Sequence, residues 1–190
     1  MKFKEFNYNS LDEIRNESDK LGLNLHFSNN MDLFKKKVVI GRHVIPNSLG
    51  FHPMEGCDGT RNGSPGVLTS RRYERFARGG AGLLWFEAVS VVHEGRANPR
   101  QLWIHEENIR DFETLVKSYI KNAQEEFGNG FSPLLIAQLT HSGRFSRPDD
   151  KYAPIIACKN PIINERYKNE DIAHVIEDHE LEALEEKFVE

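Results

Sequence analysis

The stretch PLLIAQLTHSGR, residues 133–144, joins a short apolar run to a group of polar side chains. The apolar run, residues 133–137, has the length of a fully buried strand. It is followed by the amide of Gln138, the imidazole of His141 and the guanidinium of Arg144. In α/β proteins, ligands bind at the carboxyl ends of parallel strands. The stretch therefore predicts a buried strand that ends at a ligand-binding edge, where Gln138 can donate and accept hydrogen bonds.

Two segments nearer the N-terminus have the same pattern of an apolar run followed by polar residues. Residues 47–54 are expected to form the first buried strand, which leads into a glycine-rich loop. Residues 82–86 form a second apolar run, which ends at Glu87. Within it, Trp85 and Phe86 are expected to fill the space between the sheet and a helix.

Helices are expected between these strands. Thr69 can cap a helix that stops at Gly79. A longer helix is expected from about His105 to Phe127, because its hydrophobic residues recur at spacings of three and four and define one apolar face. Strands and helices that alternate without hairpin turns between them predict parallel βαβ units.

Other segments flank this alternating region. A short polar helix over 10–21, with Ser10 or Asn9 as its N-cap, and a hairpin over 38–45 are expected before it. A long loop that contains prolines is expected over 145–177. A final helix is expected to follow it behind a cap at Asp178.

The number of elements limits the fold. Three parallel strands are too few to close a barrel, and both faces of a parallel sheet must be covered. We therefore expect an α/β chain that is the N-terminal part of a (β/α)8 TIM barrel, with about three barrel strands and truncated before the fourth. Residues 1–30 are interpreted as a helical extension and residues 31–190 as the partial barrel domain.

The composition of the chain excludes several classes of function. The chain has 190 residues, of which 38% are hydrophobic and 28% charged, and this is typical of a globular protein. A net charge of -4 gives no reason to expect nucleic acid or a membrane as a partner. The two cysteines, Cys57 and Cys158, and an N-terminus without an apolar leader predict a cytoplasmic protein. The scattered histidines predict no metal site.

Three segments together resemble the Old Yellow Enzyme family of NADH:flavin oxidoreductases, including its 2,4-dienoyl-CoA reductase branch. They are NSLGFHPM at 47–54, GGAGLLWFEAVSV at 79–91 and QLTHSGR at 138–144, each similar to a barrel strand of that family. The resemblance covers residues 31–190, with the same order and spacing. It implies a TIM barrel that binds FMN at the carboxyl face of its strands.

The resemblance also implies which residues contact the cofactor. Gln138 would hydrogen-bond the pyrimidine edge of the flavin, and Ala88 would approach the ring. The loop after the first strand would lie against the isoalloxazine, largely through the backbone groups of His52, Pro53, Met54 and Glu55. The implied reaction passes hydride from NAD(P)H through FMN to an activated alkene or enoyl substrate, a small molecule. A flavin-dependent amine dehydrogenase or demethylase on the same fold is the alternative.

Three positions depart from the family pattern. Glu55 stands where the family commonly has Thr, Cys or Ala, and a carboxylate there would either have its pKa raised by burial or lower the flavin potential. Cys57 stands where some members have an aromatic residue on the substrate side, so it is a substrate-side candidate. Ser48 replaces the usual Arg.

The family's remaining machinery has no counterpart in residues 1–190. Its substrate-anchoring histidine pair, its proton-donating tyrosine and the groups that bind the FMN phosphate lie on later strands. We therefore expect no catalytic residue within this chain and an inactive fragment, and an iron–sulfur cluster only if the chain continues. A non-catalytic half-barrel that dimerises to cover its open edge is the alternative from a different class of function.

Structural roles are expected for three polar residues near the strand ends. Glu87 is expected to hold backbone amides or Arg96. His141 is expected to organise its own turn through hydrogen bonds rather than to act as a base. Arg144 is expected to meet a carboxylate of its own loop or a ligand.

Overall fold

The computed structural model describes residues 5–168 and 171–189, which fall into two compact units, Met1–Leu33 and Phe34–Glu190. The first unit contains helix α1 (Leu11–Lys20). Ser10 caps α1, since its hydroxyl accepts a hydrogen bond from the Glu13 amide at 3.3 Å. Of the two predicted caps, Ser10 is therefore confirmed and Asn9 is not the N-cap. A short helix, α2 (Asp32–Lys35), lies at the boundary between the two units.

The second unit is built around a three-stranded parallel sheet of β3 (Gly50–Phe51), β4 (Leu83–Ser90) and β5 (Leu134–Thr140), in that order. Parallel pairing is confirmed for both neighbouring pairs. The first strand is much shorter than the predicted 47–54. The Asn47 side chain bonds the Gly80 carbonyl and the Gly82 amide, both at 2.7 Å, in place of a backbone ladder.

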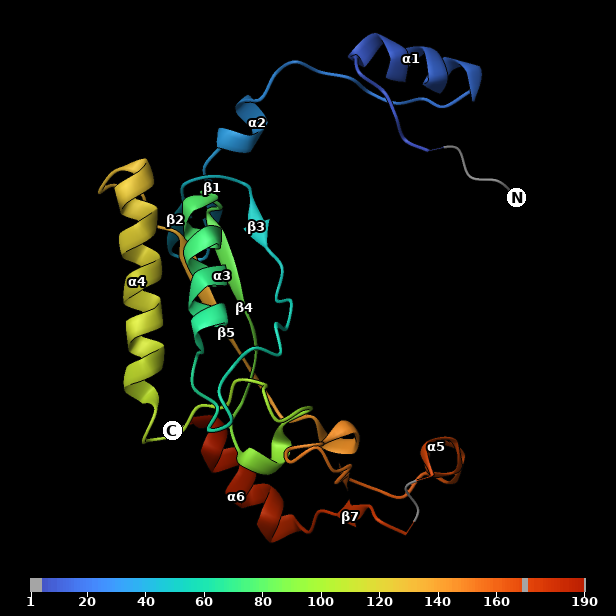
Figure 1. Cartoon of the computed structure of the whole chain (residues 1–190), viewed down its shortest axis with the longest axis vertical. Helices are drawn as coiled ribbons and strands as arrows, with labels where there is room; N and C mark the ends of the chain where they lie inside the picture. The colour runs from blue at the N-terminus through green and yellow to red at the C-terminus, as the bar shows by residue number, and fades with distance from the viewer. Residues whose placement is uncertain (1–4, 169–170, 190) are drawn as a thin grey trace. The chain divides into compact units, whose positions relative to one another are not determined.

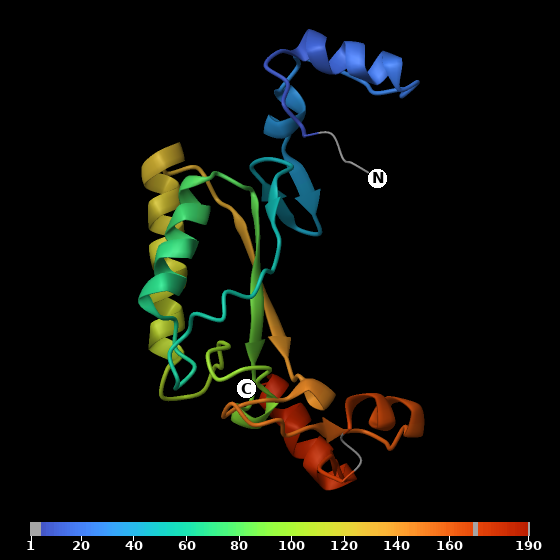
Figure 2. The same cartoon turned by 45° about the vertical axis from the view of Figure 1, so that its right-hand side comes forward.

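Helices α3 (Val67–Arg78) and α4 (Ile109–Phe127) lie side by side on one face of this sheet (Figures 1 and 2). The expected apolar face of α4 is confirmed. Its residues join those of α3 and β4 in one core, which consists of Tyr73, Ala77, Leu84, Phe86, Leu115, Tyr119 and Ala123. Burial in this core raises the pKa of Tyr119 to about 12.

Both helices begin at residues other than those predicted. Gly66, not Thr69, is the N-cap of α3, and Thr69 accepts the Gly66 amide at 3.1 Å from inside the first turn. Helix α4 begins four residues after His105, because the Asn108 side chain accepts the His105 amide at 2.9 Å and closes a turn before the helix.

An irregularity in β4 decides which way its side chains point. Trp85 pairs with Ile136, and the next pair is Ala88 with Gln138, so β4 carries one extra residue. This bulge turns both Phe86 and Glu87 toward the helices. Phe86 is buried as predicted, whereas Trp85 is 42% exposed and lies on the opposite face, so its predicted place between sheet and helix is wrong.

The remaining elements are short. Strands β1 (Val38–Ile40) and β2 (His43–Ile45) form the predicted antiparallel hairpin. The expected long loop is wrong, because it contains α5 (Pro161–Tyr167) and a parallel pair, β6 (Ile155–Ile156) with β7 (His174–Val175).

Helix α6 (Asp178–Val189) follows β7. The predicted Asp178 cap is wrong, since Asp178 is already helical and the Glu180 carboxylate accepts the Glu177 amide at 2.8 Å. In the part of the chain that the structure describes, no helix is long and apolar enough to span a membrane.

Candidate functional site

The carboxyl ends of β4 and β5 bring two predicted cofactor contacts together. Ala88 and Gln138 are register partners, so their side chains point to the same face of the sheet. That face is opposite the helices, because Leu135 packs against the helical core and Gln138 lies three residues further along β5, where side chains alternate between faces. The Ala88 carbonyl accepts a hydrogen bond at 3.1 Å from the side-chain amide of Gln101, which is buried. This bond fixes the end of the strand.

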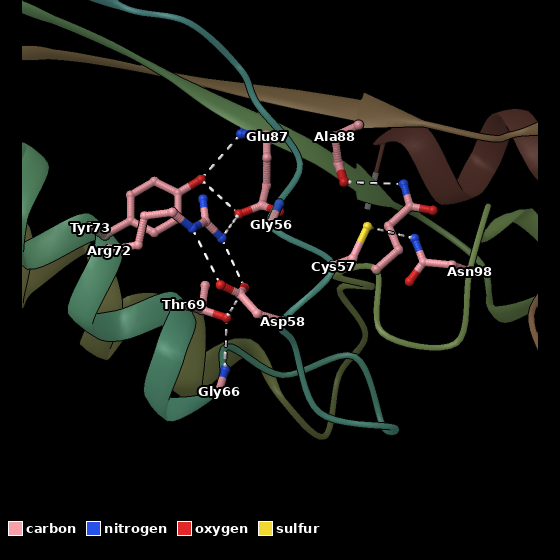
Figure 3. A network of polar contacts seen from close by, with 11 residues as sticks. Gly56, Cys57, Asp58, Gly66, Thr69, Arg72, Tyr73, Glu87, Ala88 and Asn98 are labelled. Atoms are coloured by element: carbon pink, nitrogen blue, oxygen red, sulfur yellow. Dashed lines mark hydrogen bonds and ion pairs between the residues drawn. The ribbon is translucent and has the colours of Figure 1, made fainter.

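The loop after β3 is fastened to the same edge. The Gly56 amide donates to the Glu87 carboxylate at 2.9 Å, as the close-up view shows (Figure 3). Gly56 permits this close approach, because a Cβ atom there would lie 2.2 Å from the Arg72 guanidinium. The loop segment that precedes Gly56 carries the other four predicted contacts. Of these, Pro53 is half-buried, and the others are exposed, namely His52, Met54 and Glu55.

A buried polar network holds this loop against β4 and α3 (Figure 3). Arg72 of α3 donates to the Glu87 carboxylate at 2.7 Å and to the Asp58 carboxylate at 2.8 Å. The Tyr73 hydroxyl donates to Glu87 at 3.1 Å and accepts the Glu87 amide at 3.2 Å. The Thr69 hydroxyl completes the network by donating to Asp58 at 2.7 Å.

The network shifts the pKa values of its members. Burial alone would raise the pKa of Asp58, but hydrogen bonds from Arg72 and Thr69 outweigh it and lower the pKa. For Arg72, burial opposes the charge, and the bonds to Asp58 and Glu87 raise its pKa above the ordinary value. Burial and then the charge of Glu87 raise the pKa of Tyr73. Arg72 is therefore a permanent cation and Tyr73 a neutral donor.

Glu55 and Cys57 lie on either side of the anchored Gly56. Although the Glu55 side chain is exposed, desolvation by the surrounding protein, followed by the negative charge of Glu87, raises its pKa, which is one of the two outcomes expected at this position. Cys57 has a left-handed backbone with φ of 47°, and its sulfur accepts a hydrogen bond from the Asn98 side chain at 3.2 Å. Burial and the charge of Glu55 raise the pKa of Cys57, which keeps it a thiol rather than a reactive thiolate.

The three predicted structural roles have different outcomes. Glu87 holds a backbone amide as expected, but its cation is Arg72 rather than Arg96. Arg96 is buried and donates to backbone carbonyls instead, among them that of Arg61 at 2.9 Å.

His141 organises its own turn as predicted, because its Nδ1 accepts the Gly143 amide at 2.9 Å. Burial lowers its pKa, so the ring is held neutral. Arg144 bonds the Asn164 side chain at 2.5 Å and the Cys158 carbonyl at 3.4 Å, so the expected carboxylate of its own loop is wrong, and contact with a ligand stays a prediction.

Sequence patterns gave little sign of the network residues. Asp58, Thr69 and Arg72 lie on a loop and one helix face, at spacings that are common in any capped helix. Arg72 reaches Glu87 only because the bulge in β4 turns that carboxylate toward α3. No periodic signal marks such a bulge.

The residues at this edge fit a planar heterocycle. Ala88, which is 6% exposed, presents only a methyl group, and the Gln138 side-chain amide has no hydrogen-bond partner within the described residues. An amide that faces outward at a strand end can donate to and accept from the edge of a ring. His52 to Glu55 form an adjacent segment whose backbone turns sharply, since the Met54 amide bonds the His52 carbonyl at 2.9 Å.

Comparison with known proteins shows a similarity of structure. No protein-family model and no curated protein matches the sequence. The old yellow enzyme homologue from Zymomonas mobilis has a similar structure, with a TM-score of 0.60 and 19% identity over 82% of this chain and 42% of its own. Morphinone reductase in complex with tetrahydroNAD gives a TM-score of 0.59 and 19% identity, over 82% of this chain and 44% of its own.

Histamine dehydrogenase from Rhizobium sp. 4-9 is also similar, with a TM-score of 0.59 and 21% identity over 86% of this chain and 24% of its own. These likenesses confirm the resemblance to Old Yellow Enzymes at the level of the fold. The chain spans less than half the length of each of these three proteins.

Proposed function

We propose that this chain supplies the first flavin-facing edge of an FMN-dependent NAD(P)H oxidoreductase of the ene-reductase type. The bound FMN would accept hydride from NAD(P)H and pass it to an activated alkene or enoyl substrate. The proposal rests on this chain's residues at the carboxyl ends of β4 and β5 and in the loop after β3. It is supported by the shared fold and by the complex of morphinone reductase with tetrahydroNAD.

One observation carries the proposal. The bulge in β4 places Ala88 opposite Gln138 on the open face, while the Gly56–Glu87 bond draws the loop of residues 52–55 to the same edge. Three segments that are far apart in the sequence thus meet at one place. In this arrangement Gln138 would orient the flavin by its pyrimidine edge, and the loop would cover part of the ring.

The experiment measures FMN binding to the whole chain by the quenching of flavin fluorescence. We expect Gln138→Leu to weaken binding about tenfold, which corresponds to one lost hydrogen bond of roughly 1.4 kcal/mol. Gln124→Leu, on α4 and away from the strand ends, is the matched control and should leave the affinity unchanged. A chain that does not bind FMN, or a Gln138 variant that binds it equally well, would contradict the proposal.

A second candidate is oxidation of an amine on the same fold, for which the unpaired carboxyl of Glu55 is the supporting observation. Among the described residues no cation pairs with it, and an ammonium substrate would provide one. Histamine dehydrogenase shows that the fold occurs in a protein named for an amine. The two candidates differ in their reductant. Flavin bleached by NADH or NADPH supports the first, and flavin bleached by an amine alone supports the second.

A further inference from the structure

We propose that the segment after β5 forms a second binding site, which takes an aromatic ring that bears an anionic group. The site is a cavity of about 400 Å³, a size within the range of small-molecule pockets. It is lined by Ala97, which follows β4, and by Phe145, Arg147, Tyr152 and Tyr167, which follow β5. None of these residues belongs to the edge proposed to face the flavin, so the site goes beyond the proposed function.

Two aromatic rings form one corner of this cavity. Phe145 ends the 3₁₀ helix η2 (Gly143–Phe145), and Tyr167 ends α5. Their rings meet at an angle of 85°, with the centroids 5.4 Å apart. Phe145 is 56% exposed and Tyr167 is 40% exposed, so much of both rings is in contact with water. A ligand ring can stack against these faces and remove that apolar surface from water.

Arg147 supplies a cation at the same cavity. Within the residues that the structure describes, no hydrogen bond or ion pair involves its guanidinium. The nearest acidic residues along the chain have other partners. Asp149 pairs with His93 at 3.3 Å, and Asp150 pairs with Arg61 at 3.8 Å. A guanidinium without a carboxylate partner can bind a carboxylate or a phosphate through two parallel hydrogen bonds.

The backbone that carries the ring and the cation is fixed by hydrogen bonds. The Arg147 amide donates to the Arg96 carbonyl at 2.7 Å, and the Ala153 amide donates to the Ser146 carbonyl at 2.9 Å. Ser146 is 0% exposed, whereas Phe145 and Arg147 on either side of it line the cavity. The positions of ring and cation are therefore set before a ligand arrives, which reduces the entropy that binding costs.

The charge of this segment also favours an anion. From Arg144 to Lys168 the chain has six lysine and arginine residues and three acidic residues, whereas the whole chain has a net charge of -4. Two of the three acidic residues are the aspartates that are already paired. A negatively charged ligand is therefore attracted to this segment, and its aromatic ring distinguishes it from a simple anion.

Two kinds of molecule have this chemistry. An aryl carboxylate joins a ring directly to an anionic group, and a nucleotide joins an aromatic base to a phosphate through a sugar. Either would place its ring against Phe145 and Tyr167 and its anionic group at Arg147. Benzoate and adenosine monophosphate are probes of the two kinds. Tighter binding of benzoate assigns the site to aryl carboxylates, and tighter binding of adenosine monophosphate assigns it to nucleotides.

The test titrates the whole chain, without FMN, with each probe in an isothermal calorimeter. We expect at least one probe to bind, and Arg147→Met should weaken this binding at least about tenfold, because a charge-assisted hydrogen bond is lost. Tyr167→Leu should weaken it as well, since it removes a stacking surface and keeps the charge. Arg110→Met is the matched control. Arg110 is exposed at the start of α4, so its removal should leave binding unchanged.

A second measurement locates the bound probe. In a chain with ¹³C-labelled tyrosine, the ring resonance that Tyr167→Leu removes should shift on addition of the probe. The resonance of Tyr119, which is 1% exposed in the core, should not shift. Acetate, which has no ring, should not displace the probe at an equal concentration.

Several results would overturn this site. They are the absence of binding by both probes, equal losses in Arg147→Met and Arg110→Met, full binding by Tyr167→Leu, displacement of the probe by acetate, and a Tyr167 resonance that does not shift. The proposed function is tested separately, by the effect of Gln138→Leu on FMN binding. Failure of one proposal therefore leaves the other standing.

Discussion

The carboxylate of Glu87 depends on a single guanidinium. We predict that Arg72→Met destabilises the fold by about 3 kcal/mol, because it leaves a buried charge without its cation. Arg78→Met is the matched control. Its partner Glu74 is 45% exposed, and such surface pairs contribute about 0–1 kcal/mol. Urea denaturation of the three proteins measures the difference. Equal losses in the two variants would show that the network does not stabilise the loop.

Asp58 should give the protein a specific sensitivity to acid. Its folded-state pKa lies below the ordinary 3.8, so its contribution to stability is present above that value and is lost as the pH falls toward the lowered pKa. We predict a fall in the free energy of unfolding below about pH 4 that Asp58→Asn removes. Asp150→Asn, whose side chain is 70% exposed, should retain the fall. Chemical denaturation at a series of pH values tests this.

Among the elements, β4 has the most demanding environment, since Trp85 is the one exposed residue between Leu83 and Ser90. Leu84 is fully buried against the helices, whereas Trp85 is 42% exposed on the other face. We predict that Leu84→Ala costs about 3 kcal/mol through lost burial and the cavity left behind. Trp85→Ala should cost less than Leu84→Ala, since 42% of Trp85 is already in contact with water and its removal leaves no enclosed cavity. Thermal or urea unfolding checks both, and a larger loss for Trp85→Ala would contradict the assigned faces.

The elements that sequence patterns predicted are those with long periodic signals. Helix α4 and the pairing of β4 with β5 follow from hydrophobic spacing and from the absence of hairpin turns. Helix α5 lies where a loop is predicted, although Asn160 and Pro161 form an ordinary capped start, because the prolines of this segment are typical of loops. The predicted Glu87–Arg96 pair failed for a different reason. A bulge reverses the direction of a side chain without any mark in the composition.

The site shows the same division between local and long-range information. The strand-end positions of Ala88 and Gln138 were predictable, because apolar runs locate strand ends and a resemblance aligns them. Their pairing across the bulge depends on one extra residue in β4, which no sequence pattern indicates. The sharing of Arg72 between Asp58 and Glu87 cannot be predicted from local patterns either, since it joins a loop, a helix and a strand. Flavin contact by these residues stays a prediction.

For the second unit as a whole, one edge of the sheet and the face opposite α3 and α4 are the features that other elements leave open. Strand β5 lies at that edge, and in the described residues no further strand pairs with it. Leu139, near the end of β5, is 42% exposed, and Trp85 on the opposite face is equally exposed. Parallel sheets are normally covered on both faces, and open edges promote association.

We therefore predict that the purified chain self-associates in a concentration-dependent way and that Leu139→Lys weakens this association at least about tenfold. The substitution removes an apolar group from the edge strand and adds a charge, which is how natural edges resist pairing. Ile109→Lys is the matched control, because Ile109 is 51% exposed at the start of α4 rather than on a strand edge. Sedimentation velocity over a range of concentrations measures both. If the native chain stays monomeric throughout, or if the two variants behave alike, the open edge of β5 is not a surface of association.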